Sequence, residues 1–599
     1  MQQKNGTNWK YDKTLDCMLF FAQRVDELLF HHTTDTYRFP SLSLRGLAIE
    51  FCSVYMDVLH GVINSKNLPL IIDEFNDRLQ ADPLAKSILS EEYVIRFQKS
   101  YGSWDAKTQF ENINYIGRKL SNKTYYDAVV KKITELIAEN TKKKEIDSLA
   151  RIWVREAIDC GYDENYLYKI LHKVFFHDEV SSLDSLSSFF SAFDFKRKTF
   201  DVYIGFAQDL SPIKVLFEKI VPANGTLKII SPSEVPVGIK TKNQKTILKF
   251  ESIKALDLFS AYETAFSIAS HVVDSYAFFR HDGSTIKTYG QVVCADKSIV
   301  SIRQRQLLKH RVSAQSRTDS ERNADMLLSA LFSNSPNRED LRRIIRIHNS
   351  ALKSESTNDS LLSLWSLAES LVDVDNTVTK ENADTKEKED TQRYKSGNVI
   401  DIIIPFQKST YVSKLVQTLL SDIKHWNSAF FDEYIKAIEF GDNEIEKTFA
   451  FLSFDSTQTI REELFKRTEL YPLLRNRVAT LNEQFHNSKH IKACIAEHEK
   501  RIRWHIQRIY RARNYIIHDG ASDDEMNYDL LINLHFYIDT VVSKIVELID
   551  ASPYNDTVSD VISEHKIEVS ILDEMLDKQE NEKICESNAK KYLYYDYRI

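Results

Sequence analysis

The sequence has few glycines, prolines and cysteines for its length. Its 599 residues include 14 glycines and 11 prolines, and because these residues interrupt regular backbone, their scarcity favours helices. The six cysteines are scattered, at positions 17, 52, 160, 294, 494 and 585. No two of them have the spacing of a zinc site or a redox dithiol. We therefore expect reduced thiols in a cytoplasmic protein, with no metal site and no cofactor.

A long hydrophobic run is missing from the N-terminal region. Its first apolar cluster, residues 17 to 22, is short and lies between Asp16 and Arg24, so we predict neither a signal peptide nor a membrane span. An excess of positive charge is missing as well, because the formal net charge is -8. This balance argues against a protein that coats nucleic acid indiscriminately, and any RNA contact must be a local basic patch.

The length predicts several domains, because 599 residues are too many for one core. Hydrophobic residues make up 43% of the chain, which is enough to build substantial cores. We predict a mainly α, multidomain protein with four regions. They are a helical N-terminal domain (1–195), an α+β domain (196–305), a helical domain with a charged linker at 376–398 (306–550), and an acidic, tyrosine-rich C-terminal tail (551–599).

The α+β region is predicted from short β-branched and aromatic segments bounded by turn residues. No glycine-rich phosphate loop follows any of these segments, which excludes a dinucleotide-binding unit. The expected strands are 202–206, 227–230, 247–250, 290–294 and 299–302, with a helix at about 255–278.

In the tail, Tyr592, Tyr594, Tyr595 and Tyr597 predict docking onto the protein's own body or onto a partner.

One motif stands at the end of an amphipathic helix near position 520. Ile502, Ile506 and Ile509 form an apolar stripe, and Arg513 occupies the next position on it. A guanidinium on such a face needs an acidic partner or an anionic ligand. Asn514 follows Arg513, and His518 comes before the helix stop Asp519-Gly520. Two positions five residues apart on an ideal helix are separated by about 140° around the helix axis. Arg513 and His518 therefore share a cleft only if the helix end distorts or a second subunit completes the site.

The spacing of an arginine and a histidine five residues later is not specific by itself. It recurs at Arg305 and His310 and at Arg343 and His348. Neither recurrence has asparagine after the arginine or Asp-Gly after the histidine, so we interpret both as solvated basic helix faces.

The string Arg513-Asn514-x-x-x-His518-Asp519-Gly520 resembles the signature of HEPN domains, most closely that of the ApeA-like group of prokaryotic anti-phage defence proteins. Residues 360–371 look like the first helix of that group, and they include Glu369, a candidate partner for Arg513. A rim carboxylate facing water is the alternative reading of Glu369. The resemblance covers roughly residues 340 to 550, and only these two helices in it are specific.

The resemblance implies a metal-independent endoribonuclease formed by a helical bundle that dimerises, so that two copies of the motif face one cleft. It implies cleavage of RNA, with transfer RNA as one candidate, to 2′,3′-cyclic phosphate and 5′-hydroxyl ends. The catalytic candidates are Arg513 on the phosphate, Asn514 as an orienting group, His518 as general acid or base, and Glu369. By analogy, the N-terminal half regulates the nuclease, and a phage-derived activator releases it during abortive infection.

A basic and aromatic stretch before the motif is a candidate RNA-binding surface, because cations bind phosphates and aromatic rings stack on unpaired bases. A solvated charged face is an equally good interpretation of the same stretch. The RNA-binding candidates are Arg501, Arg503, Trp504, Arg508, Tyr510 and Arg511.

Two other functions stay open on the sequence. One is a non-catalytic helical module that binds RNA or protein and uses Arg513 in a structural ion pair. The other is a HEPN toxin that a partner antitoxin neutralises.

Overall fold

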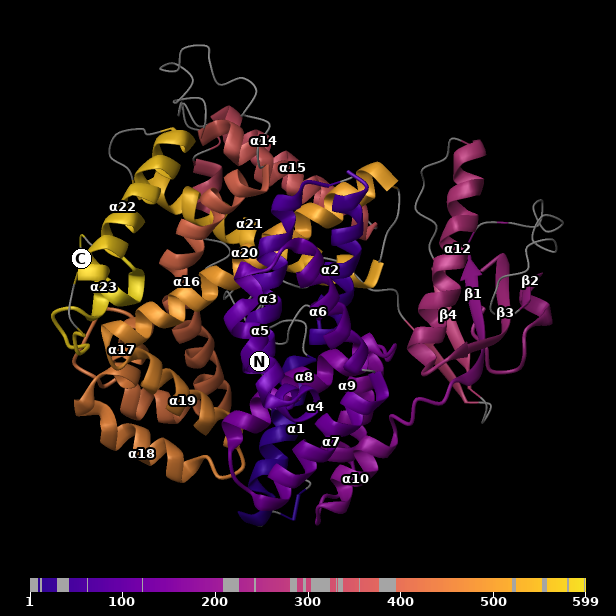
Figure 1. Ribbon diagram of the computed structural model, residues 1–599, viewed down its shortest axis with the longest axis horizontal. Helices are drawn as coiled ribbons and strands as arrows, with labels where there is room; N and C mark the ends of the chain where they lie inside the picture. Colours follow the sequence, from indigo (N-terminus) through magenta and orange to yellow (C-terminus); the bar gives the residue numbers. More distant parts are fainter. Residues whose placement is uncertain are drawn as a thin grey trace. The chain divides into compact units, whose positions relative to one another are not determined.

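The computed structural model is mainly helical in the part of the chain that it describes, and along the sequence one five-stranded antiparallel sheet follows the N-terminal helices and precedes the C-terminal ones (Figure 1). The predicted fold class is thereby confirmed. The described residues are 9–10, 13–29, 42–61, 63–120, 122–207, 209, 226–241, 244–280, 288–294, 298–302, 324–329, 331, 338–354, 356–375, 395–519, 524–551, 557–578, 581–596 and 598.

The chain divides into two compact units, and each is made of segments far apart in sequence. Unit 1 contains 1–6, 30–121 and 307–599, and unit 2 contains 7–29 and 122–306. One boundary between the units, at 306, lies one residue from the predicted domain limit at 305, and the units have no boundary at 195 or 550. Residues 30–121 belong to the same unit as the C-terminal helices. Most of the predicted linker, residues 376–394, lies outside the described residues, and a helix begins at Lys395.

Unit 2 combines a helical part with the sheet. Aromatic side chains fill the helical core, where the Trp153 ring lies 5.2 Å from that of Phe189 and 5.4 Å from that of Phe193. The helices are α1 (Asp16–Leu28), α7 (Asn122–Glu139), α8 (Lys143–Asp159), α9 (Glu164–His172), α10 (Asp184–Ser191) and α12 (Leu258–Arg280).

The sheet has the order β2-β3-β1-β4-β5, and every neighbouring pair is antiparallel. All five predicted strands are confirmed within a few residues. Helix α12 packs against the sheet (Figure 1), and a close approach between Gly290 and Tyr262 leaves no room for a side chain, since a Cβ on Gly290 would lie 2.0 Å from the tyrosine ring. The strands are β1 (Lys198–Phe206), β2 (Thr226–Ile230), β3 (Thr246–Ala255), β4 (Thr288–Val293) and β5 (Ile299–Ile302).

All named elements in the described residues of unit 1 are helices. Its N-terminal helices are α2 (Leu44–Leu59), α3 (Leu68–Ala81), α4 (Ala85–Leu89), α5 (Glu91–Ser100) and α6 (Ala106–Lys119). Its C-terminal helices are α14 (Arg338–Lys353), α15 (Thr357–Asp375), α16 (Lys395–Phe430), α17 (Glu444–Ser453), α18 (Gln458–Arg467), α19 (Pro472–Phe485), α20 (Ser488–Asp519), α21 (Asp524–Ala551), α22 (Val558–Lys578) and α23 (Ala589–Tyr594).

Two hydrophobic cores organise the C-terminal part of unit 1. The first joins α14, α15, α21 and the facing halves of α16 and α20, and it contains the predicted stripe of Ile502, Ile506 and Ile509, all fully buried. The second joins α17, α19, α23 and the other halves of α16 and α20. The long helices α16 and α20 therefore contribute side chains to both cores.

The C-terminal segment is a packed part of unit 1 rather than a tail. Helix α22 spans Val558–Lys578, and Tyr592 and Tyr595 are buried in the second core. The Tyr594 hydroxyl donates to Oε1 of Glu446 at 3.0 Å. Of the two predicted docking surfaces, the protein's own body is the one that these tyrosines contact. Tyr597 lies outside the described residues.

No helix within the described ranges has an apolar stretch long enough to cross a bilayer. The six cysteines all fall within those ranges, and none of them forms a disulfide.

A lysine ammonium is enclosed between α16 and α21. Lys414 Nζ donates to Oγ1 of Thr540 and lies 4.3 Å from the centre of the Phe536 ring. Burial lowers the pKa of Lys414 to about 7, although the nearby Asp539 carboxylate acts in the opposite direction. Between pH 7 and the ordinary lysine pKa the folded protein therefore binds fewer protons than the unfolded chain, so its stability rises with pH across this range.

We expect Lys414→Met to stabilise the protein more at pH 6 than at pH 10, because the substitution removes a buried charge that the wild type carries only at the lower pH. Urea unfolding midpoints of both proteins at the two pH values measure this difference. Lys436→Met is the control, since the Lys436 side chain is 59% exposed. A gain for Lys414→Met that is equal at both pH values contradicts the prediction.

Candidate functional site

Arg513 and Glu369 meet between α20 and α15, as the sequence predicts. Arg513 Nη2 lies 3.7 Å from Oε1 of Glu369, and both side chains are largely buried, at 19% and 24% exposure. Arg513 Nη1 donates to Oδ1 of Asn514 at 3.0 Å. Because Glu369 is only 24% exposed and lies beside Arg513, it is not the water-facing rim carboxylate of the alternative interpretation. Arginine, amide and carboxylate thus form one polar group at the edge of the first core.

Trp365 fixes the position of the Glu369 carboxylate. Its indole Nε1 donates to Oε1 of Glu369 at 2.9 Å, one helical turn along α15. The Trp365 ring is 1% exposed and lies 5.7 Å from the ring of Tyr510 on α20. Because the tryptophan is locked in the core, the oxygen that faces Arg513 is held by a rigid neighbour rather than by a mobile surface side chain.

The backbone of α20 stays helical through both ends of the motif. The helix ends at Asp519, where the sequence predicts its stop, and it includes Arg513 and His518. Five residues of regular helix place these two positions about 140° apart, so the helix end does not distort to bring them together. The side chain of His518 lies outside the described residues. Of the two ways in which the sequence allows Arg513 and His518 to share one cleft, a distorted helix end is therefore excluded.

Lys500, Arg508 and Arg511 lie on the opposite face of α20 from the isoleucine stripe, and each of them binds an acidic residue of α2 or α3. Arg508 forms two hydrogen bonds with Glu50, each 3.0 Å long, and a third with Glu74 at 2.6 Å. Arg511 Nη2 donates to the same Glu50 carboxylate at 2.7 Å. Nη1 of Arg508 and of Arg511 has no hydrogen-bond partner among the described residues.

This cluster is enclosed and electrically balanced, with two carboxylates and two guanidinium groups. Burial by itself would raise the pKa of Glu50, but the charges of Arg508 and Arg511 outweigh it and lower the pKa to about 2. Glu50 therefore stays ionised at neutral pH. Its contribution to stability is present above the ordinary glutamate pKa and is lost as the pH falls towards 2.

The burial of this face corrects the predicted RNA-binding surface. Trp504, Arg508 and Arg511 are 2%, 1% and 4% exposed, and the Trp504 indole donates to Oδ2 of Asp73 on α3 at 3.0 Å. A side chain enclosed in an intramolecular pair cannot reach a phosphate or a base without first leaving that pair. In this structure these three residues join helices and do not form a nucleic-acid surface.

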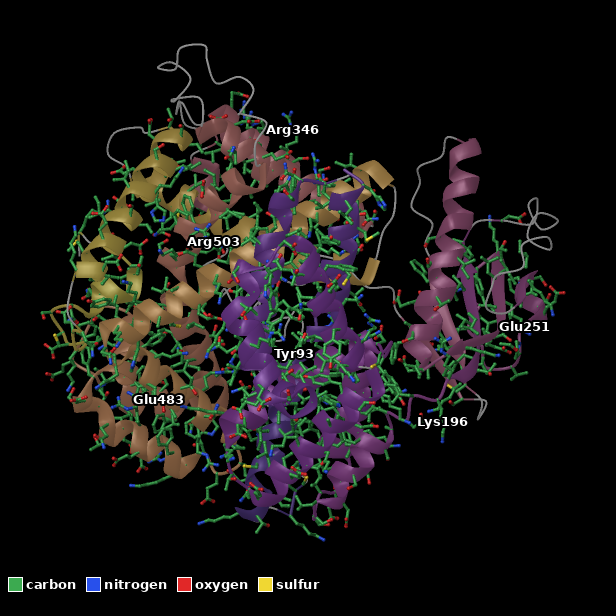
Figure 2. The ribbon with its side chains drawn as sticks, viewed as in Figure 1. Tyr93, Lys196, Glu251, Arg346, Glu483 and Arg503 are labelled. Atoms are coloured by element: carbon green, nitrogen blue, oxygen red, sulfur yellow. The ribbon has the colours of Figure 1, made fainter. Side chains whose placement is uncertain are left out.

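The other three RNA-binding candidates have different surroundings. Arg501 and Arg503 pair with Glu497 and Glu499 one turn earlier on α20, at 2.9 and 2.7 Å. Arg503, labelled in Figure 2, keeps 41% of its side chain exposed. Tyr510 packs beside Trp365 in the first core. The residues predicted to form one basic surface therefore have three kinds of surroundings: the buried contact with α2 and α3, ion pairs within α20, and the first core.

The two other arginine–histidine spacings differ from the motif. Arg305 and His310 lie outside the described residues. On α14, Arg343 pairs with Asp340 at 3.5 Å and is 47% exposed, as predicted for a solvated face. His348 differs from Arg343 because its side chain is partly buried and its ring lies 5.2 Å from that of His535. This burial lowers the pKa of His348.

The acidic residues that hold α20 were missed by the sequence analysis. They lie more than 400 positions away from their partners, so no local pattern joins them. A signal does exist on each side separately. Glu50 and Asp57 share one face of α2 by their spacing of seven, and the polar positions 500, 504, 508, 511 and 515 follow one face of α20.

No group of three or more histidine, cysteine or acidic side chains in the described ranges could hold a metal ion. Comparison with known proteins found no family model, no curated protein and no solved structure that matches this chain.

Arg508→Met should destabilise the protein by about 3–5 kcal/mol, because it leaves Glu50 and Glu74 buried with one fewer cation between them. Arg503→Met, on the same helix, should cost less than about 1 kcal/mol, because its ion pair is exposed. Urea unfolding curves of the two variants beside the wild type measure both effects. Equal losses would show that burial of the Arg508 cluster is not what stabilises the contact.

Proposed function

We propose that unit 1 is a metal-independent endoribonuclease of the HEPN type that acts in anti-phage defence by abortive infection. The observation that carries the proposal is the group of Arg513, Asn514 and Glu369 at the end of α20, where the resemblance to HEPN domains places the active site. The proposed substrate is RNA, with transfer RNA as one candidate. The proposed setting is the cytoplasm, with a phage-derived activator as trigger.

The reaction is an internal transesterification. The 2′-hydroxyl oxygen of one ribose attacks the adjacent phosphorus, and the bond from phosphorus to the 5′-oxygen of the next nucleotide breaks. The products are a 2′,3′-cyclic phosphate and a 5′-hydroxyl, and one proton moves from the 2′-oxygen to the 5′-oxygen overall. A histidine is suited to move that proton near neutral pH, and His518 is the candidate for this role.

Arg513 suits the stabilisation of the phosphate charge. The guanidinium has five N–H donors in a planar fork that matches phosphate oxygens. Its ion pair with Glu369 is long, at 3.7 Å, and Oε1 of Glu369 also accepts from Trp365 at 2.9 Å. A guanidinium held loosely by a carboxylate that is itself anchored is oriented in advance and can still turn to a phosphate.

The proposal includes a homodimer. Arg513 and His518 lie about 140° apart on a regular helix, so two copies of the motif are needed for an arginine and a histidine to face one phosphate. In this arrangement the arginine of one protomer and the histidine of its partner act on the same bond. Residual activity in mixtures of an Arg513 variant with a His518 variant is the expected consequence.

A second candidate function is favoured by the ion pair itself. If Arg513 only pairs with Glu369, the bundle is a non-catalytic module that binds RNA or protein. The two functions differ in the product, because only the nuclease leaves new 5′-hydroxyl ends. A HEPN toxin held inactive by a partner antitoxin keeps the chemistry proposed above and differs only in its control.

We expect purified full-length protein, mixed with an extract of phage-infected cells as the source of the activator, to cleave transfer RNA or total RNA in the presence of a metal chelator. Arg513→Ala and His518→Ala should each lower the cleavage rate by about 10² to 10⁴-fold, because each removes a charge-stabilising or proton-transferring group. Sequencing of 5′-hydroxyl RNA ends, from these reactions and from phage-infected cells that express each protein, measures activity and target together.

Arg343→Ala is the matched control, because Arg343 has the same spacing to a histidine but lies on the exposed face of α14. It should cleave like the wild type. The nuclease is ruled out, and the binding module is favoured, by either of two results. One is that new 5′-hydroxyl ends persist in both motif variants. The other is that the wild type produces no such ends in purified reactions or in infected cells.

A further inference from the structure

The face of α20 that α2 and α3 cover continues into the motif. Residues 500, 504, 508, 511 and 515 recur at intervals of three or four, and each has a hydrogen-bonding partner on α2 or α3. His518 is three residues after Tyr515 and seven after Arg511. Its position therefore lies on this same face of the helix.

Two sides of the same helix end are thus held by different elements. On one side Glu369 of α15 contacts Arg513. On the other side Asp57 of α2 accepts a hydrogen bond from the Tyr515 hydroxyl, and Glu50, two turns earlier on α2, binds Arg511. Contacts on opposite faces fix the rotation of a helix about its axis, which one contact alone does not.

We propose that Asp57, acting through Tyr515, is a positioning residue that orients the turn of α20 carrying His518. This inference rests on the proposed ribonuclease function and extends it to α2, a helix that the sequence assigns to a separate N-terminal domain. Asp57 touches no reacting group in this role. It sets the angle at which the motif is presented to the scissile phosphate.

The chemistry of the contact suits this task. A carboxylate that accepts from a phenol forms a short, directional, charge-assisted hydrogen bond. Burial, together with the hydrogen bond to Asp57, raises the pKa of Tyr515, so the hydroxyl keeps its proton and donates it across the whole physiological range. A displacement of about 1 Å at a reacting group can cost as much as 10²-fold in rate, so a small rotation of the last turn is sufficient for a measurable loss.

We expect Tyr515→Phe to lower kcat about tenfold and to leave KM unchanged, because it deletes one hydroxyl and keeps the ring. Asp57→Ala should give the same loss, and the double variant should be no worse than either single one, since both remove the same bond. Lys500→Met is the matched control. It breaks the 2.6 Å pair with Asp77 on α3, on the same face of α20 but 15 residues before Tyr515.

Hydrogen exchange of the α20 backbone separates this inference from the proposed function, because it needs no activity. Amides of residues 511–519 should exchange faster in Tyr515→Phe than in the wild type, and their exchange in Lys500→Met should be unchanged. If these amides exchange faster in Tyr515→Phe but the wild type does not cleave RNA, the hydrogen bond between Tyr515 and Asp57 does hold the end of α20, and the nuclease function is overturned. Unchanged exchange in Tyr515→Phe, or additive rate losses in the double variant, would overturn the positioning role.

Discussion

The buried pairing of Arg508 and Arg511 with Glu50 and Glu74 is the interaction on which unit 1 depends. It joins helices from the two ends of the sequence, and the opposite charges cancel inside the contact. Removing any one partner leaves an uncompensated buried charge, which is far more costly than losing an exposed ion pair. The same contact sets where α20 lies, and α20 carries the candidate site at its last turns.

Local patterns of side chains were sufficient to predict much of this molecule. Apolar residues at helical spacing located the first core, and β-branched segments between turns located all five strands. The pair of Arg513 with Glu369 was also within reach, because an arginine on an apolar stripe needs a carboxylate. The contact of α20 with α2 was not, because charge complementarity between segments more than 400 residues apart has no local signature.

The division of the chain changes how control of the site has to be understood. The sequence suggests an N-terminal regulatory half and a C-terminal nuclease. In the structure, residues 30–121 belong to the same compact unit as the motif, and the sheet belongs to the other unit with α1 and α7–α10. Helices α2 and α3 are therefore part of the proposed catalytic body. Unit 2, with its antiparallel sheet, is the part of the predicted N-terminal half that lies outside the proposed catalytic body.

The interleaved order of the segments has a consequence for synthesis. Glu74 leaves the ribosome 434 residues before its partner Arg508, a delay of roughly 20 to 90 s at ordinary rates of translation. Unit 2 ends at residue 306, so all of its segments emerge while unit 1 still lacks α14 to α23. The contacts that join α20 to α2 and α3 therefore form only when the chain is nearly finished, and a chain that stops before Arg508 lacks them.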